Sequence, residues 1–236
     1  NTANTGSISN NNITIIGNTP GIYLTRSDSI NITHNKIDAT GFGKGIRLYG
    51  GSDYAIVLNN TINTNPTYYT GYGIHMHGSN NPAENIIENN TITTGGEAIY
   101  LRKITHSNVT NNIINSSTSS NKFAISVQYD STNNTFERNN ILQADNAIRL
   151  GWAGMGWRYW PADNTLINNT FSNINSYHFY LYGYPGIGGE QINGTYFIDQ
   201  QIGKYYFFNQ GGTAYFKDSK YGELRFKKAI TGFGTN

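Results

Sequence analysis

The 236-residue sequence contains no cysteine, so neither a disulfide framework nor a thiolate-bound zinc site can form. Asp, Glu, Lys and Arg make up only 13% of the chain, and the formal net charge is +2 without a Lys/Arg-rich run. This balance argues against nucleic acid as a partner. No apolar run approaches the roughly 20 residues that span a bilayer, which argues against membrane insertion.

Helical periodicity is nearly absent as well. Residues 1–180 show no useful stripe of apolar residues at the i, i+3, i+4, i+7 spacing of an amphipathic helix. Apolar and polar residues instead alternate over four to six positions, which is typical of short strands. The length and this pattern predict one large all-β domain.

One phrase recurs along the chain: an apolar residue, two variable residues, Asn, one variable residue, and then Ile or Phe. Its central residues are Asn11, Asn35, Asn60, Asn90, Asn112, Asn139 and Asn169. Successive central residues are 22 to 30 positions apart, which is the range of solenoid repeats. Asn tolerates unusual backbone angles at a sharp turn, can bond its own backbone, and can stack its amide from coil to coil. These residues are therefore expected to form a structural ladder.

A second phrase follows each copy of the first: Gly or Ala, then Ile, any residue, and Leu, Met or Val. It begins at Gly21, Gly45, Gly73, Ala98, Ala124 and Ala147, with a degenerate copy at 178–181. Together the phrases indicate coils of about 25 residues with three short strands, the signature of a parallel β-helix. Each strand then pairs with its counterpart one coil away, so equivalent positions form rows along the axis.

The expected domain organisation follows the repeats. Residues 1–184 are predicted to form a parallel β-helix, which with the last coil has about seven to eight coils. Residues 185–230 are predicted to hold the last coil and a β-rich C-terminal cap, because terminal repeats usually differ in order to cover the stack. Residues 231–236 read as a linker-like tail.

The seven paired phrases resemble the right-handed parallel β-helix repeat superfamily over residues 8–182. This superfamily includes pectate lyases, polygalacturonases, and the carbohydrate-binding and sugar-hydrolase domains of surface proteins. The resemblance implies a right-handed helix and a substrate on the exposed face of the strand that contains the second phrase. It does not specify an activity, since function has to be argued from a site.

Alternation places two rows of side chains on the outside of that strand. The first row is Tyr23, Arg47, His75, Tyr100, Ser126, Arg149 and Tyr180. The second row is Thr25, Tyr49, His77, Arg102, Gln128, Gly151 and Tyr182. Neither row holds a carboxylate, whereas glycoside hydrolysis needs a pair of carboxyl groups and calcium needs several oxygen ligands. We therefore expect neither a glycoside hydrolase nor a calcium-dependent lyase, and no cofactor.

The residue types on this face suit three roles. Tyr can stack on sugar rings while Arg and His hydrogen-bond hydroxyls and carboxylates, which favours a binding face. The ligand-binding candidates are Arg47, Tyr49, His75, His77, Tyr100 and Arg102. In a metal-independent polysaccharide lyase, Tyr100 or His75 would remove the proton next to a uronate carboxylate, and Arg47 or Arg102 would neutralise that carboxylate. Alternatively, the rows are plain surface in which neighbouring aromatics stabilise the sheet.

His75 and His77 form the one weak candidate for a metal site. Residues i and i+2 of a strand face the same side, so two imidazoles could hold copper or zinc. A third ligand is needed, and neither row offers an acid or a Cys. No metal is therefore expected.

A second candidate surface is the longest turn after the second phrase, residues 151–161, which holds all three Trp residues. Long loops inserted at one coil of a solenoid often have a binding function. The candidates there are Trp152, Trp157, Tyr159 and Trp160, together with Arg149. They would form a platform for sugars or for a protein, unless the loop folds back over the side of the helix.

Asn-x-Ser/Thr sequons make glycosylation candidates of Asn12, Asn31, Asn108, Asn115, Asn133 and Asn193, although an Asn- and Thr-rich repeat also generates sequons by chance. The composition is common on secreted and cell-surface proteins. We predict an extracellular or cell-surface module that binds carbohydrate, such as an acidic glycan, or a neighbouring surface protein, without catalysis. The alternatives are a metal-independent lyase for a uronate-containing glycan, and a subunit that self-associates end to end or laterally in a surface layer or fibre.

Overall fold

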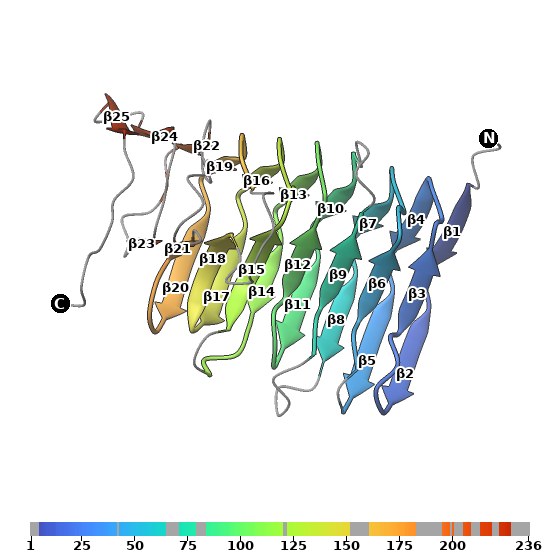
Figure 1. Cartoon of the computed structure of the whole chain (residues 1–236). Coiled ribbons are helices and arrows are strands. Elements are labelled where there is room, and N and C mark those ends of the chain that lie inside the picture. The colour runs from blue at the N-terminus through green and yellow to red at the C-terminus, as the bar shows by residue number, and fades with distance from the viewer. Residues whose placement is uncertain are drawn as a thin grey trace.

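The computed structural model describes residues 5–41, 43–64, 71–78, 84–119, 122–151, 161–182, 195–198 and 200, and the strands at 205–208, 213–218 and 222–227. Every regular element among them is a β-strand, and the strands stack in successive coils along one axis (Figure 1). The predicted all-β parallel β-helix is confirmed. In this part of the chain, no helix is long and apolar enough to cross a membrane.

Each coil contributes one strand to each of three sheets. Sheet A contains β1 (Gly6–Ser9), β4 (Ile30–Thr33), β7 (Ile56–Leu58), β10 (Ile86–Glu88), β13 (Asn108–Thr110), β16 (Thr135–Glu137), β19 (Thr165–Ile167), β22 (Thr195–Ile198), β24 (Thr213–Asp218) and β25 (Gly222–Lys227). Sheet B contains β2 (Asn12–Ile16), β5 (Lys36–Thr40), β8 (Thr61–Thr64), β11 (Thr91–Thr94), β14 (Ile113–Asn115), β17 (Asn140–Ala144) and β20 (Thr170–Ile174). Sheet C contains β3 (Ile22–Thr25), β6 (Ile46–Tyr49), β9 (Ile74–His77), β12 (Ile99–Arg102), β15 (Phe123–Gln128), β18 (Asn146–Leu150), β21 (Phe179–Tyr182) and β23 (Tyr205–Phe208).

The strand counts of the sheets define the coils. Sheet B has 7 strands, so we number seven coils, from β1–β3 to β19–β21, and β22 and β23 extend sheets A and C beyond them. Pairing is parallel up to β24, whereas β24 and β25 are antiparallel. The capping role of residues 185–230 stays a prediction, and the linker-like tail at 231–236 lies outside the described residues.

Inward side chains of the coils build one apolar column. In sheet C the inward row is Ile46, Ile74, Ile99, Ile125, Ile148 and Phe179, each with 0% of its surface exposed. Burying a side chain of this size contributes roughly 1.5–3 kcal/mol relative to leaving it in water. Because the row is continuous from coil to coil, it fixes which residues of sheet C must face outward.

The residue before each inward Ile of sheet C must be small. A Cβ atom on Gly73 would lie 2.6 Å from the carbonyl oxygen of Ala98 and would also collide with the side chain of Ile92. A side chain at position 73 would therefore point into the core, as the side chain of Ile74 does. Later coils accept Ala at this position, which explains why the second phrase begins with Gly or Ala.

The central Asn residues form a continuous ladder in the turn between sheets A and B. From Asn11 to Asn139, each Nδ2 donates to the Oδ1 of the ladder Asn one coil further on, at 2.9–3.0 Å, and Asn169 is the last acceptor. The backbone N–H of each donor Asn bonds the same Oδ1. From Asn35 onward these side chains are at most 1% exposed, so the ladder satisfies amides that would otherwise be costly to bury.

The residue before each ladder Asn supplies the unusual backbone angle of this turn. The angle φ is 48–58° at Asn10, His34, Asn59, Asn89, Asn111, Arg138 and Asn168. The expectation that the ladder Asn itself takes such an angle is therefore wrong. Asn is frequent at the preceding position because its short polar side chain tolerates the left-handed region, although His34 and Arg138 show that other residues fit.

A second row of hydrogen bonds, which the sequence phrases did not reveal, lines the turn between sheets C and A. The Ala55 N–H donates to Asn85 Oδ1 at 2.8 Å, and the Asn85 N–H donates to Ser107 Oγ at 2.9 Å. The row continues at 3.0 Å from the Ser107 N–H to Asn134 Oδ1, and at 3.0 Å from the Asn134 N–H to Asn164 Oδ1. At two of the three corners of the coil, side-chain oxygens thus accept hydrogen bonds from backbone N–H groups of the neighbouring coil.

Candidate ligand-binding face of sheet C

The two predicted outward rows of sheet C are in register across the coils. Strand pairing aligns the first row as Tyr23, Arg47, His75, Tyr100, Ser126, Arg149 and Tyr180. It aligns the second row as Thr25, Tyr49, His77, Arg102 and Gln128. The residues that sequence reasoning proposed for ligand binding on coils two to four therefore lie side by side, while their binding role stays a prediction.

A third row, which we call the leading row, lies at the N-terminal ends of five strands of sheet C, either two residues before the strand (β6, β9 and β12) or at its first residue (β15 and β18). Its members are Lys44, Tyr72, Glu97, Phe123 and Asn146. Tyr72 contacts the rings of His75 and Tyr100, with centroids 5.2 Å away in both cases, so the leading row adds side chains to the outward face. Sequence reasoning missed it because strict alternation would have turned these residues inward.

Glu97 corrects the expectation that the face lacks a carboxylate. Its Oε1 lies 3.0 Å from Arg149 Nη2, and the two side chains are only 12% and 14% exposed. Burial raises the pKa of Glu97, while the Arg149 guanidinium acts in the opposite direction. Among the described outward residues of sheet C, Glu97 is the one carboxylate, so the carboxyl pair needed for glycoside hydrolysis is absent there.

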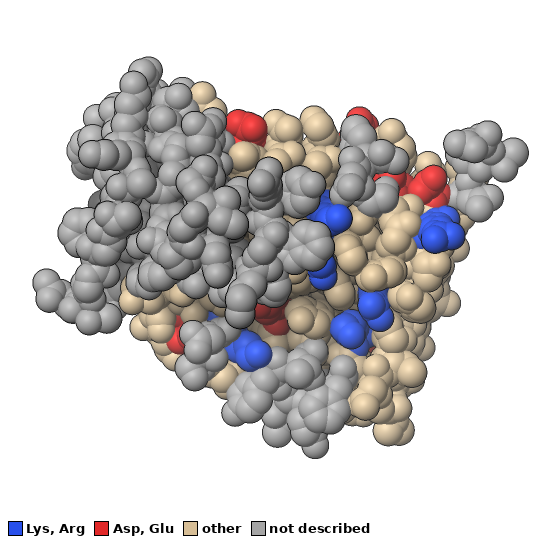
Figure 2. Space-filling view, in the orientation of Figure 1, with Lys and Arg blue, Asp and Glu red and all other residues tan. Residues whose placement is uncertain are grey.

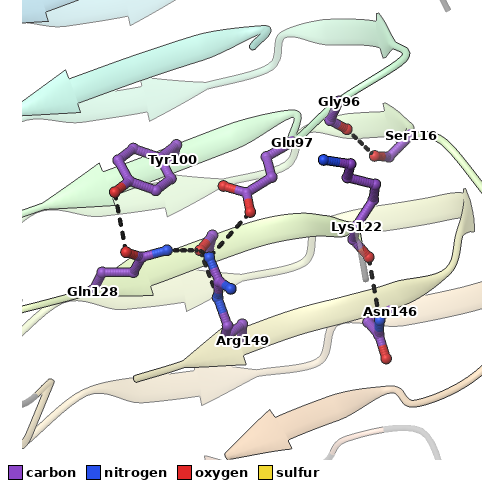
Figure 3. Close-up of polar contacts among 9 residues, drawn as sticks. Gly96, Glu97, Tyr100, Ser116, Lys122, Gln128, Asn146 and Arg149 are labelled. Atoms are coloured by element: carbon purple, nitrogen blue, oxygen red, sulfur yellow. Dashed lines mark hydrogen bonds and ion pairs between the residues drawn. The ribbon is translucent and has the colours of Figure 1, made fainter. Parts of the chain in front are cut away.

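A hydrogen-bond network extends from Glu97 across the centre of the face (Figure 3). Arg149 donates to Ser126 Oγ from Nε at 3.0 Å and from Nη2 at 2.7 Å. Gln128 Nε2 donates to the same hydroxyl at 2.9 Å, and Gln128 Oε1 accepts from the Tyr100 hydroxyl at 3.0 Å. Arg149 and Tyr100, both predicted to bind ligand, are thus held in fixed positions by neighbouring coils.

Arg47 and Arg102 are held by aromatic rings, and neither has an acidic partner in the part of the chain that the structure describes. The Arg47 guanidinium lies 5.2 Å from the ring centroid of Tyr23 and 5.0 Å from that of Tyr49. The Arg102 guanidinium lies 3.9 Å from the ring centroid of Tyr129. Neither forms a salt bridge with any carboxylate in the described residues. Within the described residues, the charges of both guanidinium groups are therefore not neutralised by an ion pair.

The two histidines on the face are uncharged at neutral pH. Burial and the charges of Arg47 and Lys44 lower the pKa of His75 to about 3. Burial and the charge of Arg102 lower the pKa of His77 to about 4. Burial and the neighbouring cations thus both disfavour protonation of the two imidazole rings.

His75 and His77 also have different neighbours. The His75 ring packs edge-on against Tyr100 with centroids 4.8 Å apart, and the His77 ring packs edge-on against Tyr49 at 4.6 Å. Within the described ranges, no group of three or more His, Cys, Asp or Glu residues could hold a metal ion.

Buried polar atoms without a hydrogen-bond partner gather on this face. Of the eight such side-chain atoms among the described residues, five belong to sheet C or its leading row. They are Arg47 Nε, His75 Nδ1, Glu97 Oε2, Arg102 Nε and Asn146 Oδ1. Native structures pair nearly all buried polar groups, so this local concentration of unpaired atoms distinguishes the face from the rest of the described chain.

Positive charge prevails on the described part of the surface around this region. Figure 2 shows several Lys and Arg side chains near the middle of the molecule, with Asp and Glu found mainly toward its edges. Burial and the charge of Arg47 lower the pKa of Lys44, whose Nζ lies 5.7 Å from the Tyr72 ring centroid. The face is therefore both cationic and aromatic, in contrast to the near-neutral chain as a whole.

The other predicted sites divide between described and undescribed residues. Trp152, Trp157, Tyr159, Trp160 and the sequon residue Asn193 lie outside the described residues. Asn12, Asn31, Asn108 and Asn133 have exposed side chains, and Asn115 is half-buried on β14. Exposure is required for glycosylation and does not establish it, so these sites stay predictions.

Comparisons with known proteins bear on the fold. The family described as a right handed beta helix region matches residues 21–221. No curated protein sequence matches the chain. Among solved structures, the chain is similar to the A-module of the mannuronan C-5 epimerase AlgE4 from Azotobacter vinelandii, with 11% sequence identity and a TM-score of 0.46. That similarity covers 87% of this chain and 65% of the epimerase module.

Proposed function

The chain belongs to the right-handed β-helix family, and we propose that it is a non-catalytic module that binds an acidic polysaccharide along sheet C. The observation that supports this most strongly is the unpaired state of Arg47 and Arg102. Each has a buried Nε without a partner and no carboxylate among the described residues within salt-bridge distance. Both arginines are only half-buried, so an anionic ligand could approach their guanidinium groups and offset the cost of partly burying an unpaired cation.

The aromatic residues beside these cations favour a sugar as the bearer of the charge. Tyr23 and Tyr49 are 49% and 37% exposed, so both rings can be reached from solvent. Both tyrosines flank the Arg47 guanidinium. A sugar ring stacked on either tyrosine would therefore place its substituents near a positive charge. Polyuronates combine a stackable ring with a carboxylate on each sugar. Because such polymers occur outside cells, the proposal includes an extracellular or cell-surface location.

The protonation states on the face weigh against the lyase alternative. A histidine whose conjugate acid has a pKa of about 3 is a weak base for abstracting a proton next to a carboxylate. Burial and the nearby Glu97 carboxylate raise the pKa of Tyr100, so its phenolate is less accessible than that of a free tyrosine. Its hydroxyl also donates to Gln128 Oε1 at 3.0 Å. Binding therefore fits these groups better than catalysis does.

Affinity measurements test the proposal directly. The protein is expected to bind polygalacturonate or alginate and not a neutral glucan, and rising salt should weaken binding because the attraction is ionic. Arg47→Gln and Arg102→Gln should each weaken binding about tenfold or more, the effect of losing one charge-assisted hydrogen bond. Arg138→Gln is the matched control, since Arg138 is exposed and pairs with Glu137 far from sheet C.

Two outcomes would contradict the proposal. If the protein binds neither polyuronate, or binds a neutral glucan equally well, the face does not select anionic glycans. If incubation with either polymer releases unsaturated products that absorb in the ultraviolet, and His75→Ala abolishes that release, the chain is a lyase.

A further inference from the structure

Arg149 is aligned with Arg47 in the first outward row, but its charge is already paired inside the chain. Its Nη2 lies 3.0 Å from Glu97 Oε1, and its guanidinium also donates to Ser126 Oγ from two nitrogens. The guanidinium lies over the Phe123 ring, 4.1 Å from the ring centroid, and the side chain is only 14% exposed. Arg149 is therefore a poor binding group for an anion from outside.

The position of Glu97 makes the charge of the face uneven along the axis. Glu97 and Arg102 both belong to coil four, but Glu97 precedes β12 by two residues whereas Arg102 is the last residue of that strand. The Glu97 side chain extends toward coil six, where it meets Arg149 (Figure 3). Arg102 has no ion pair in the described part of the chain. The arginine of coil six is thus neutralised, while that of coil four is not.

The outward residues of coil five are also nearly inaccessible. Ser126 and Gln128, which occupy the two outward rows on this coil, are 0% and 1% exposed. Phe123 and Asn146, the leading-row residues of coils five and six, are each 3% exposed. In contrast, every outward-row residue on coils one to four is half-buried or exposed. Burial and charge therefore both end the accessible cationic face at coil four.

This accessible face has the dimensions of a short glycan segment. Each of the four coils places one tyrosine on it: Tyr23, Tyr49, Tyr72 and Tyr100. A chain that contacts all four coils runs along the axis over three steps of roughly 4.8 Å, or about 14 Å. If one sugar of an extended chain occupies about one such step, the face takes about four sugars.

We infer that the glycan site covers coils one to four only, that it takes about four acidic sugars, and that Glu97 sets its end by neutralising Arg149. A carboxylate bound over coils five and six would gain no net attraction from the Glu97–Arg149 pair, because the two charges cancel. The inference rests on the proposed function and adds to it the length of glycan that the site selects.

Calorimetric titration of the intact chain with oligomers from the trimer to the hexamer tests the inference. The oligomers are those of whichever polymer, polygalacturonate or alginate, binds the unaltered protein more tightly. A mildly alkaline buffer keeps Glu97 ionised, since burial raises its pKa. The enthalpy of binding is expected to grow up to about four sugars and then to stay constant. From the tetramer to the hexamer, affinity should rise only about threefold, because the longer chain has three ways to cover a four-sugar site.

Glu97→Gln tests the role of the carboxylate itself. The amide oxygen of the new side chain can still accept from Arg149, so the contact is kept while the charge is removed. In this variant the enthalpy should continue to grow from the tetramer to the hexamer. The ratio of hexamer to tetramer affinity should rise about two- to fivefold above that of the unaltered protein, because the charge of Arg149 is no longer cancelled.

Glu137→Gln is the matched control. It also removes the carboxylate of an Arg–Glu pair, but the pair with Arg138 lies at the end of β16 in sheet A. Both the enthalpies and the affinity ratio should stay as they are in the unaltered protein.

The failures of the two proposals can be told apart. If the enthalpy of the unaltered protein is complete with the trimer, or still grows from the tetramer to the hexamer, the inferred length is wrong and the proposal of acidic glycan binding stands. If Glu97→Gln behaves like Glu137→Gln, Glu97 does not set the end of the site. If neither polygalacturonate nor alginate binds, the proposed function is wrong and the inference fails with it.

Discussion

Arg149 Nη2 lies 3.0 Å from Glu97 Oε1 although the two residues are 52 positions apart in the sequence. Glu97 belongs to the fourth coil and Arg149 to the sixth, so one whole coil lies between them. Taking two charges out of water is costly, and their attraction offsets that cost only while both partners are present. The pair therefore ties the fourth coil to the sixth, and the integrity of the face depends on a contact that skips a coil.

Removing one partner of this pair should be much worse than removing both. Arg149→Leu leaves Glu97 buried without its cation and is expected to lower the free energy of unfolding by about 3–5 kcal/mol. The double variant with Glu97→Leu should recover most of that loss. Denaturant unfolding of the four species gives the coupling energy. The exposed pair Arg138–Glu137 is the reference, for which loss of the cation should cost at most about 1 kcal/mol.

His75 is expected to make the protein less stable in acid. Its folded-state pKa of about 3 lies below its ordinary value of 6.5, so the unfolded chain binds a proton that the folded chain excludes. Stability from this residue is complete above pH 6.5 and is lost progressively as the pH falls toward 3. His75→Phe should melt close to the unaltered protein at neutral pH and lose less stability on acidification. If the melting temperatures of the two proteins fell by equal amounts on acidification, the prediction would be wrong.

The Asn ladder should be sensitive at its centre. Asn90→Leu removes the Oδ1 that accepts from both the backbone N–H and Nδ2 of Asn60. The buried backbone N–H of Asn60 then loses its acceptor, while Nδ2 keeps only the carbonyls of Ile32 and Leu58, and the change is expected to cost roughly 1–3 kcal/mol or more. Asn63→Ala, on the exposed face of sheet B, is the control and should change stability by no more than about 0.5 kcal/mol. Equal midpoints of denaturant unfolding for the two variants would count against the ladder.

Gly73 should not tolerate a methyl group. An added Cβ would lie 2.6 Å from the Ala98 carbonyl, so Gly73→Ala is expected to destabilise the protein by about 1–3 kcal/mol. The converse change at the equivalent position of the next coil, Ala98→Gly, removes a methyl group without a clash. It should cost only about 0.5–1 kcal/mol, the usual effect of losing one buried methyl group. Thermal melting distinguishes the two, and an unchanged melting temperature for Gly73→Ala would contradict the packing described above.

The sequence contained most of the scaffold because the scaffold repeats. Inward Ile residues and ladder Asn residues are chosen by the same contacts in every coil, so they recur at equivalent positions and reveal the rows. Once Ile74 and Ile99 were known to face inward, alternation placed His75 and Tyr100 next to each other, as the structure shows. The row in the turn between sheets C and A was missed because Asn and Ser share the same role there.

Glu97 was missed for a geometric reason. Alternation from the inward Ile99 predicts an outward Ala98 and an inward Glu97. The chain bends at this corner, so Ala98 and Ile99 are both in the core, and Glu97 turns outward toward Arg149. A rule based on the period of a straight strand fails wherever two successive residues face the same way. The clue in the sequence was the restriction of the second phrase to Gly or Ala at its first position.

The ladder also gives the molecule a direction. Every amide from Asn11 to Asn139 points its nitrogen toward the C-terminal coils and its oxygen toward the N-terminal ones, and Asn169 continues the same sense to Gln200 Oε1 at 3.3 Å. One amide rotated by half a turn would face an N–H to an N–H on one side and an oxygen to an oxygen on the other. The row therefore has two ordered states, all forward or all reversed, and the backbone N–H groups that bond the same oxygens select one of them. Each amide inside the row is held in its orientation by the amides of the coils before and after it, so a local disturbance in one coil is opposed from both sides.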